Sequence, residues 1–206
     1  MTAEPPAFNR AGSSLVGSRP SLSFDREFQK DLLRLLPGEY CASNQDLVLS
    51  TVLGSCVAAC LYDPVAQIGG MNHFLLPGRD SGDWGGRYGV HAMELLVNEL
   101  LKRGAQRQRL VAKVFGAARV LKSMSHMDVG SDNAKFIEAY LKAEGFALQG
   151  SDLRGNKARR VLFFTKTGQA LVRHVSGAED NGIREEEQYV TQASRMSRAG
   201  GDIELF

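Results

Sequence analysis

The stretch "STVLGSCVAACLYDP" at residues 50–64 decides the fold. It holds two apolar runs of strand length, separated by a short, polar Gly-Ser-Cys turn. A glycine ahead of Ser55 and Cys56 permits a tight bend and a close approach of the backbone. The stretch therefore predicts two strands, with a thiol placed where the chain changes direction.

Runs of the same kind lie on both sides of this turn. Bounded by turn residues, they predict four strands, within residues 39–43, 46–53, 56–63 and 69–77. A later part of the chain predicts a buried strand, then a strand, a polar loop and a hairpin, at residues 109–116 and 146–175, with the hairpin turning at 166–168.

Apolar residues at helical spacing predict two helices, over residues 88–104 and 131–145. Gly104 and Gly145 stand where a helix commonly ends in a left-handed glycine. Strands dominate early and the two helices come later. This order predicts an α+β fold, a layered β-sandwich with flanking helices.

The two ends of the chain differ from the middle in composition. Residues 1–23 are rich in Pro, Ser, Gly and Ala and predict a disordered tail. The segment 24–36 has apolar residues at helical spacing before Pro37, which predicts a short helix that packs on the domain or binds a partner. We expect one domain over 24–176 and a charged, flexible tail over 177–206.

Bulk properties exclude several classes of protein. The 206 residues carry a net charge of +2, which is too small to favour nucleic acid as a partner. No apolar run reaches 18 residues, so membrane insertion is not expected. The first residues lack the apolar segment of a signal peptide, which predicts a cytoplasmic protein. The three cysteines are expected to be free thiols.

The turn and the next strand supply a pair of reactive groups. If residues 56–63 and 69–77 pair antiparallel around Pro64 and Val65, residues whose numbers sum to 129 face each other, which places His73 opposite Cys56. Directly opposed Cβ atoms lie about 4.5–5.5 Å apart. An imidazole beside a thiol can accept its proton. Such a pair suits acyl transfer from an amide or ester, with an oxyanion hole from the backbone around Gly54 and Ser55.

A third group is needed to orient the imidazole. Residues 47–53, which lead into the turn, have no carboxylate but have two hydroxyls, Ser50 and Thr51. Since neighbours on a strand point to opposite faces, only one of them can serve. The other cysteines, Cys41 and Cys60, fit small buried apolar residues. Cys56 and Cys60 would stand about 13 Å apart on a strand, so no metal site is expected.

The segments "TVLGSCVAACLYDP", "GGMNHFLLP", "RYGVHAMELLVNELLKRGA" and "AKVFGAA" together resemble the chemoreceptor glutamine deamidase family, CheD. The resemblance extends over about residues 37–175. It implies a cysteine hydrolase, with a fold like that of deamidating toxins and no cofactor, that converts glutamine side chains on chemotaxis receptors to glutamate. It implies that Cys56 is the nucleophile and His73 the general base and acid. The family's orienting threonine matches Thr51 by type and Ser50 by offset.

The resemblance also implies a partner and shows departures. A CheC-type phosphatase is the implied partner, so the alternative function is a non-catalytic regulator of that phosphatase. Ala117 and Arg154 stand where the family usually has glycine. Residues 77–89, with Trp84, predict a mobile loop beside the site or a plain connection. A basic cluster meets an acidic receptor helix or is simply solvated: Arg154, Lys157, Arg159 and Arg160.

Overall fold

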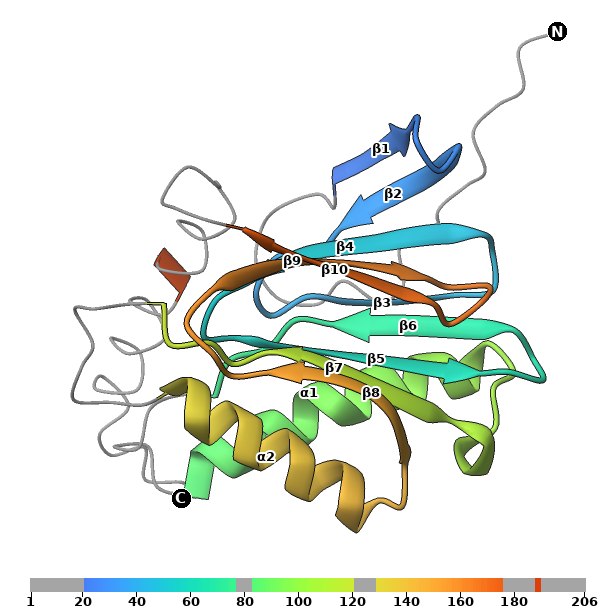
Figure 1. The fold of residues 1–206 in the computed structure, drawn as a ribbon. Helices are drawn as coiled ribbons and strands as arrows, with labels where there is room; N and C mark the ends of the chain where they lie inside the picture. Colours follow the sequence, from blue (N-terminus) through green and yellow to red (C-terminus); the bar gives the residue numbers. More distant parts are fainter. Residues whose placement is uncertain (1–20, 77–82, 121–128, 176–187, 190–206) are drawn as a thin grey trace, which may run out of the picture.

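The computed structural model describes residues 21–76, 83–120, 129–175 and 188–189. Two β-sheets are stacked, and both helices cover the outer face of one of them (Figure 1). This arrangement confirms the predicted α+β sandwich with flanking helices. The tail predictions for residues 1–20 and for nearly all of 177–206 lie outside the described residues, whereas residues 21–23 begin the first strand.

The first sheet has the strand order β1-β2-β4-β9-β10. Its strands are antiparallel neighbours except for β2 and β4, which run parallel. The bounds are β1 Ser21–Asp25, β2 Lys30–Arg34, β4 Leu47–Leu53, β9 Ala158–Phe164 and β10 Ala170–Val175.

The second sheet has the order β3-β6-β5-β7-β8, and only β7 and β8 run parallel. Helix α1 lies against β3 and β6 of this sheet, and helix α2 lies against β5, β7 and β8. The bounds are β3 Tyr40–Ser43, β5 Val57–Asp63, β6 Ile68–Asn72, β7 Val111–Gly116, β8 Ala147–Leu153, α1 Asp83–Lys102, α2 Val129–Ala143 and a short 3₁₀ helix at Arg107–Arg109.

Two apolar cores separate the layers. One lies between the second sheet and the helices, and the other lies between the two sheets. Strand β5 contributes Val57 and Leu61 to the helix side, and Ala58 and Cys60 to the inter-sheet side. This alternation follows from the two-residue period of a strand, and it explains why both faces of β5 are apolar.

The predicted strands and the two helices predicted over residues 88–104 and 131–145 are confirmed, with shifted ends. Gly104 and Gly145 adopt φ angles of +101° and +71° just beyond the helices, as predicted for C-terminal glycines. Helix α1 begins at Asp83, so the loop predicted over 77–89 is wrong for residues 83–89. Residues 77–82 lie outside the described part of the chain.

The helix predicted over residues 24–36 is wrong, since β1 and β2 form an antiparallel hairpin there. The Asp25 carboxylate accepts hydrogen bonds from the backbone N–H groups of Glu27 and Phe28, at 2.9 and 3.1 Å, and so closes the turn. Leu33 and Leu35 are buried with strand alternation. Pairing with the distant β4 outweighed the local helical spacing.

The predicted register between β5 and β6 is also wrong. The observed partners have numbers that sum to 131, as in Cys60 with Met71 and Val57 with Phe74. The connection is a four-residue loop over residues 64–67, not a two-residue turn centred on Pro64 and Val65. His73 therefore corresponds to Ala58, two residues beyond Cys56.

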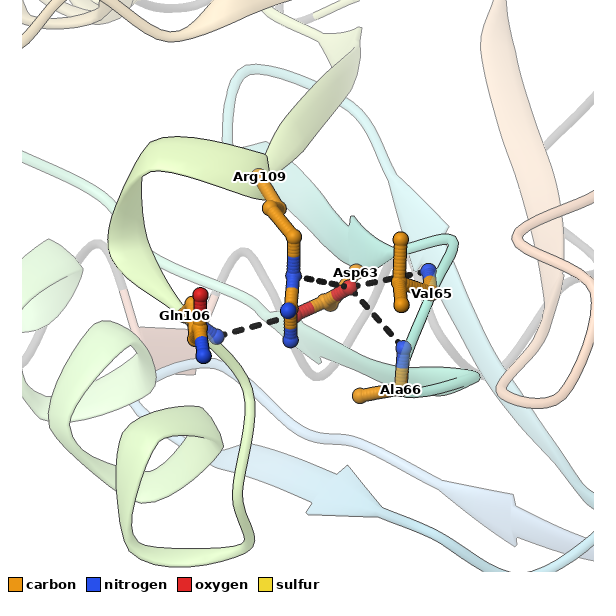
Figure 2. A network of polar contacts seen from close by, with 5 residues as sticks. All are labelled: Asp63, Val65, Ala66, Gln106 and Arg109. Carbon is orange, nitrogen blue, oxygen red and sulfur yellow. Dashed lines mark hydrogen bonds and ion pairs between the residues drawn. The ribbon is translucent and has the colours of Figure 1, made fainter.

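A buried carboxylate shapes this loop (Figure 2). Asp63 accepts hydrogen bonds from the backbone N–H groups of Val65 and Ala66, at 2.9 and 3.0 Å. It also accepts one from the Gln106 N–H at 2.8 Å and three from the Arg109 guanidinium. Burial alone would raise the pKa of Asp63, but these hydrogen bonds lower the pKa to about 2. The carboxylate thus ties the β5–β6 loop to the segment before β7.

Candidate active site

Three predicted site residues project into the layer between the sheets. On β4, Leu49 and Leu53 belong to the inter-sheet core, so Thr51 between them points the same way. Cys56 is itself part of this core, and His73 lies two residues beyond Met71, which also belongs to it. The fold thus brings a hydroxyl from one sheet to a thiol and an imidazole from the other.

Thr51 and His73 form a direct hydrogen bond. Thr51 Oγ1 lies 2.8 Å from His73 Nδ1 and donates its own proton to the Leu35 carbonyl, also at 2.8 Å. Because a hydroxyl has one hydrogen, the Thr51 oxygen accepts from an N–H at Nδ1. This arrangement leaves the lone pair of the neutral imidazole on Nε2.

The environment of His73 favours its neutral form. Burial lowers the pKa of His73 to about 4; hydrogen bonding with the Leu35 backbone opposes this shift, and the charge of Arg34 adds to it. Nε2 is buried and has no hydrogen-bond partner among the described residues. The lone pair on Nε2 is therefore available to a proton donor, as a general base requires, while the lowered pKa makes the buried imidazole a weak base.

The main chain fixes the position of the imidazole. The His73 N–H donates to the Glu39 carbonyl at 2.9 Å, and the His73 carbonyl accepts from the Gly38 N–H at 2.7 Å. These two hydrogen bonds extend the pairing of β6 with β3 by one residue. The backbone that carries the imidazole is therefore held by hydrogen bonds to the segment that leads into β3.

The Gly-Ser-Cys turn is anchored through its three carbonyl groups. The Gly54 carbonyl accepts from the Ala118 N–H at 2.7 Å, and the Cys56 carbonyl accepts from the Ala117 N–H at 2.6 Å. The Ser55 carbonyl accepts from the Asn133 side chain at 2.9 Å. Since C=O and N–H point in opposite directions across a trans peptide, the N–H groups of Ser55 and Cys56 are directed away from these anchors.

The end of β7 requires a glycine where it meets the backbone of Cys56. Gly116 has a φ of +110°, and a Cβ at this position would lie 2.1 Å from the Cys56 carbonyl oxygen. No side chain fits at that separation, so Gly116 permits the end of β7 to touch the turn. The next residue, Ala117, adopts a left-handed φ of +58°. Arg154 does the same at +70°, so both departures from the glycine pattern occupy conformations that favour glycine.

Cys56 and His73 are diagonal neighbours on one face. In the observed register His73 corresponds to Ala58, and Cys56 lies two residues along the same strand. Diagonal neighbours in a regular antiparallel pair have Cα atoms about 7–8 Å apart. Because the register differs from the predicted one by two, not by one, both side chains stay on the inter-sheet face.

The other candidate residues lie elsewhere. Ser50 alternates with Thr51, and its carbonyl accepts from the Leu35 N–H at 2.8 Å. Asn72 faces helix α1, where its amide donates to the Ala92 carbonyl at 3.1 Å, as alternation predicts. Burial raises the pKa of Cys41 to about 11, and that of Cys60 still higher, which makes both thiols weak nucleophiles.

Two residues that sequence reasoning missed contribute to the site. Asn133, wholly buried in α2, bridges the Ser55 carbonyl and the Leu76 N–H. In the sequence, Asn133 is distinguished only as a polar residue near the start of a predicted helix. Tyr189 packs against the inter-sheet core and hydrogen-bonds Tyr88 at 2.7 Å. It falls within the predicted C-terminal tail, where the composition gave no sign of packing.

The predicted basic cluster is not a uniform surface patch. Arg159 is buried and bonds the Asp152 carboxylate at 2.7 Å, and Arg154 forms a bidentate pair with Glu138. The Arg159 guanidinium therefore joins β9 to β8, whereas Arg154 ties the segment between these strands to helix α2. Among the described residues, no group of three His, Cys, Asp or Glu side chains could hold a metal ion.

Fold and site together define an α+β sandwich protein whose hydroxyl, imidazole and thiol are gathered between two sheets. A family model described as "CheD chemotactic sensory transduction" matches residues 75–174. Two relatives called "Probable chemoreceptor glutamine deamidase CheD" come from Cupriavidus metallidurans and Xanthomonas campestris pv. campestris. They are 47% and 46% identical, over 89% and 88% of this chain and 88% and 92% of their own lengths. The chain belongs to the CheD family.

A third relative of that name, from Methylobacillus flagellatus, is 41% identical over 90% of this chain and 95% of its own length. The compared part of this chain therefore spans positions 51, 56 and 73, which lie outside the residues that the family model matches. None of the helices described in the structure combines the length and the apolar composition needed to cross a membrane.

Proposed function

We propose that this protein hydrolyses selected glutamine side chains of chemotaxis receptors to glutamate, acting in the cytoplasm without a cofactor. The observation that carries the proposal is the hydrogen bond between Thr51 and His73, which leaves Nε2 without a partner among the described residues, on the face shared with Cys56. The names of the relatives support the receptor as the substrate. The two-sheet architecture supports a likeness to the fold of deamidating toxins.

In the first half of the reaction, Nε2 of His73 takes the proton of the Cys56 thiol, and the sulfur attacks the side-chain carbonyl of glutamine. A C–S bond forms and the carbonyl oxygen becomes an oxyanion. As the C–N bond breaks, the imidazolium gives its proton to the departing nitrogen, which leaves as ammonia. The product at this stage is a thioester on Cys56.

In the second half, His73 takes a proton from water, and the resulting hydroxide attacks the thioester. The C–S bond breaks, glutamate leaves, and the imidazolium returns the proton to the sulfur. Thr51 keeps Nε2 aimed at the reacting atoms through both halves. A hydroxyl stabilises an imidazolium less than a carboxylate would, so we expect a modest turnover.

The oxyanion is assigned to the backbone of the Gly54, Ser55 and Cys56 turn. The Gly54 and Ser55 carbonyls are held by Ala118 and Asn133, which directs the N–H groups of Ser55 and Cys56 to the opposite side of the turn. Fixed N–H groups need no reorganisation when charge develops on the substrate. The anchors therefore support the assignment of the oxyanion hole to this turn.

The alternative is a non-catalytic partner and regulator of a CheC-type phosphatase. A binding surface does not require a neutral, oriented imidazole next to a thiol, so the Thr51–His73 hydrogen bond favours turnover. Peptide cleavage or amine incorporation, as by a protease or transglutaminase, would use the same residues. The products separate all of these functions.

The test is incubation of the full chain with receptor cytoplasmic domains from its own source, followed by peptide mapping. We expect selected glutamines to gain about one dalton, because an amide becomes an acid at the activated thiol. Cys56→Ser should lower the rate by at least about a thousandfold. Cys41→Ser is the matched control and should keep the rate of the unaltered protein. A Cys56→Ser variant that keeps most of its activity contradicts the nucleophile assignment.

A further inference from the structure

The candidate nucleophile is closed off in the structure. Cys56 is 0% exposed and His73 is 2% exposed. A glutamine side chain that projects from another protein cannot reach a thiol with no exposed surface. If the proposed function holds, whatever covers the thiol must move before a receptor side chain enters.

Tyr189 is part of this cover. Its ring packs against the inter-sheet core to which Cys56 belongs. Its hydroxyl hydrogen-bonds that of Tyr88, near the start of α1, at 2.7 Å. The neighbouring Gln188 is exposed, so the aromatic ring and not the chain's own glutamine side chain faces the interior.

The Tyr189 hydroxyl also lies against the segment that holds the imidazole. A Cβ built on Gly38 would be 3.1 Å from this oxygen, and the Gly38 N–H donates to the His73 carbonyl. Burial, Tyr88 and Cys56 all raise the pKa of Tyr189, in keeping with a phenol held close to the thiol. Tyr189 thus lies against the Gly38 segment, bonds the start of α1 and packs on the core to which Cys56 belongs.

We propose that Tyr189 is an intramolecular cap that closes the Cys56–His73 site and must leave before a receptor glutamine can enter. This inference rests on the proposed function for its biological meaning, although access to the thiol can be measured without it. The Tyr88–Tyr189 hydrogen bond latches the cap. Loosening the latch raises the fraction of molecules whose thiol is open, and the apparent rate of any reaction at Cys56 rises by the same factor.

The experiment measures alkylation of Cys56 by limiting iodoacetamide in the full chain, read out by peptide mapping. Tyr88→Phe and Tyr189→Phe each keep the ring and remove the latch, so labelling should accelerate about two- to tenfold. Tyr189→Ala also removes the ring and should accelerate it by more than about tenfold. The matched control is Tyr62→Phe, which loses a hydrogen bond of equal length to the Lys166 carbonyl, away from the site, and should leave labelling unchanged.

Labelling of Cys60 in the same samples separates cap opening from loosening of the whole fold. Cys60 is buried between the same sheets and reports general exposure of the core. The cap predicts faster labelling at Cys56 with no change at Cys60. Unchanged labelling of Cys56 in Tyr189→Ala, or equal acceleration at Cys60, overturns the proposal.

Receptor deamidation by the same variants distinguishes the two proposals. With the cap, Tyr88→Phe and Tyr189→Phe should deamidate receptor domains faster at subsaturating concentration. If Cys56 labelling accelerates while neither the unaltered protein nor any variant deamidates receptors, the cap stands and the proposed function fails. If the Tyr189 variants instead lose deamidation with unchanged labelling, Tyr189 positions the substrate and the cap is refuted.

Discussion

The hydroxyl of Thr51 decides which nitrogen of His73 carries the proton. The hydroxyl donates its single hydrogen to the Leu35 carbonyl, so its oxygen accepts a hydrogen bond from the N–H at Nδ1 of His73. The sequence narrowed the orienting group to Ser50 or Thr51, because alternation lets only one of them face the imidazole. It could not choose between them, since the choice depends on which face of β4 lies toward the second sheet.

Replacement of these two hydroxyls tests their roles. Thr51→Ala leaves the Nδ1 proton without an acceptor, and we expect turnover at saturating receptor to fall about ten- to a hundredfold. Thr51→Ser should restore most of the rate, which a purely structural role of the Thr51 methyl group would not predict. Ser50→Ala is the neighbouring control and should stay close to the unaltered protein. Equal rates for Thr51→Ala and Ser50→Ala contradict this assignment.

The role of Asn133 could not be predicted from the sequence. Its side chain joins helix α2 to the Ser55 carbonyl, across 78 positions of the chain. Nothing near Asn133 in the sequence predicts that contact, because it depends on how α2 lies on β5 and β7. The local pattern predicted the candidate catalytic groups, while the groups that hold them in place became visible only in the tertiary packing.

At the level of elements, the β5–β6 loop shows how much turn chemistry controls. A turn centred on Pro64 and Val65 was predicted, but Asp63 folds the next residues into a longer loop. Gln67 completes it in a left-handed conformation with φ of +53°. This side-chain capping could not be read from the apolar pattern, so the strands were predicted correctly and their register was not.

The left-handed Gln67 gives a stability prediction. The left-handed conformation costs a residue with a Cβ roughly 1–2 kcal/mol, and Gln67→Gly removes this cost while keeping the conformation. Part of the gain in stability is offset by the greater freedom of glycine in the unfolded chain. We expect the free energy of unfolding to rise by about 1 kcal/mol, measured by urea denaturation. Gln67→Ala keeps the Cβ and should gain nothing. Equal midpoints for the glycine and alanine variants contradict the explanation.

The same contrast holds for the first hairpin. Apolar spacing over residues 24–36 satisfied a helix as well as a pair of short strands, and the available partner strand, β4, decided the outcome. Helices α1 and α2 were predictable because their periodic faces are long and their ends carry Gly104 and Gly145. Long periodic segments determine their own structure, and short ones depend on their neighbours.

In the whole molecule, the layer order explains why the site is enclosed. The candidate catalytic groups lie between two sheets, one of which is covered on its other face by both helices (Figure 1). The α+β sandwich followed from the order of strands and helices along the chain. The order of strands within the sheets could not be predicted in this way. Strands β2 and β4, and likewise β7 and β8, are parallel neighbours, which are not joined by a hairpin turn that the sequence could reveal. The contact of Tyr189 with the core was equally invisible to composition.

The Asp63 network ties distant parts of the molecule and should dominate its response to acid. Its folded pKa of about 2 lies below the ordinary value of 3.8, so the carboxylate stabilises the fold above that ordinary value. As pH falls from about 5 to 2, about 2 kcal/mol of stability should be lost. The measurement is the free energy of unfolding by urea across that range.

Asp63→Asn should remove this part of the acid dependence and lower stability at pH 7 by about 2–4 kcal/mol, because the Arg109 guanidinium loses a buried partner. The matched control is Glu138→Gln, which breaks the half-exposed pair with Arg154 and should cost less than about 1 kcal/mol. The difference follows from burial, since Asp63 is 0% exposed whereas the Glu138 side chain is 43% exposed. An Asp63→Asn variant with the same loss of stability between pH 5 and 2 as the unaltered protein would assign the acid response to other carboxylates.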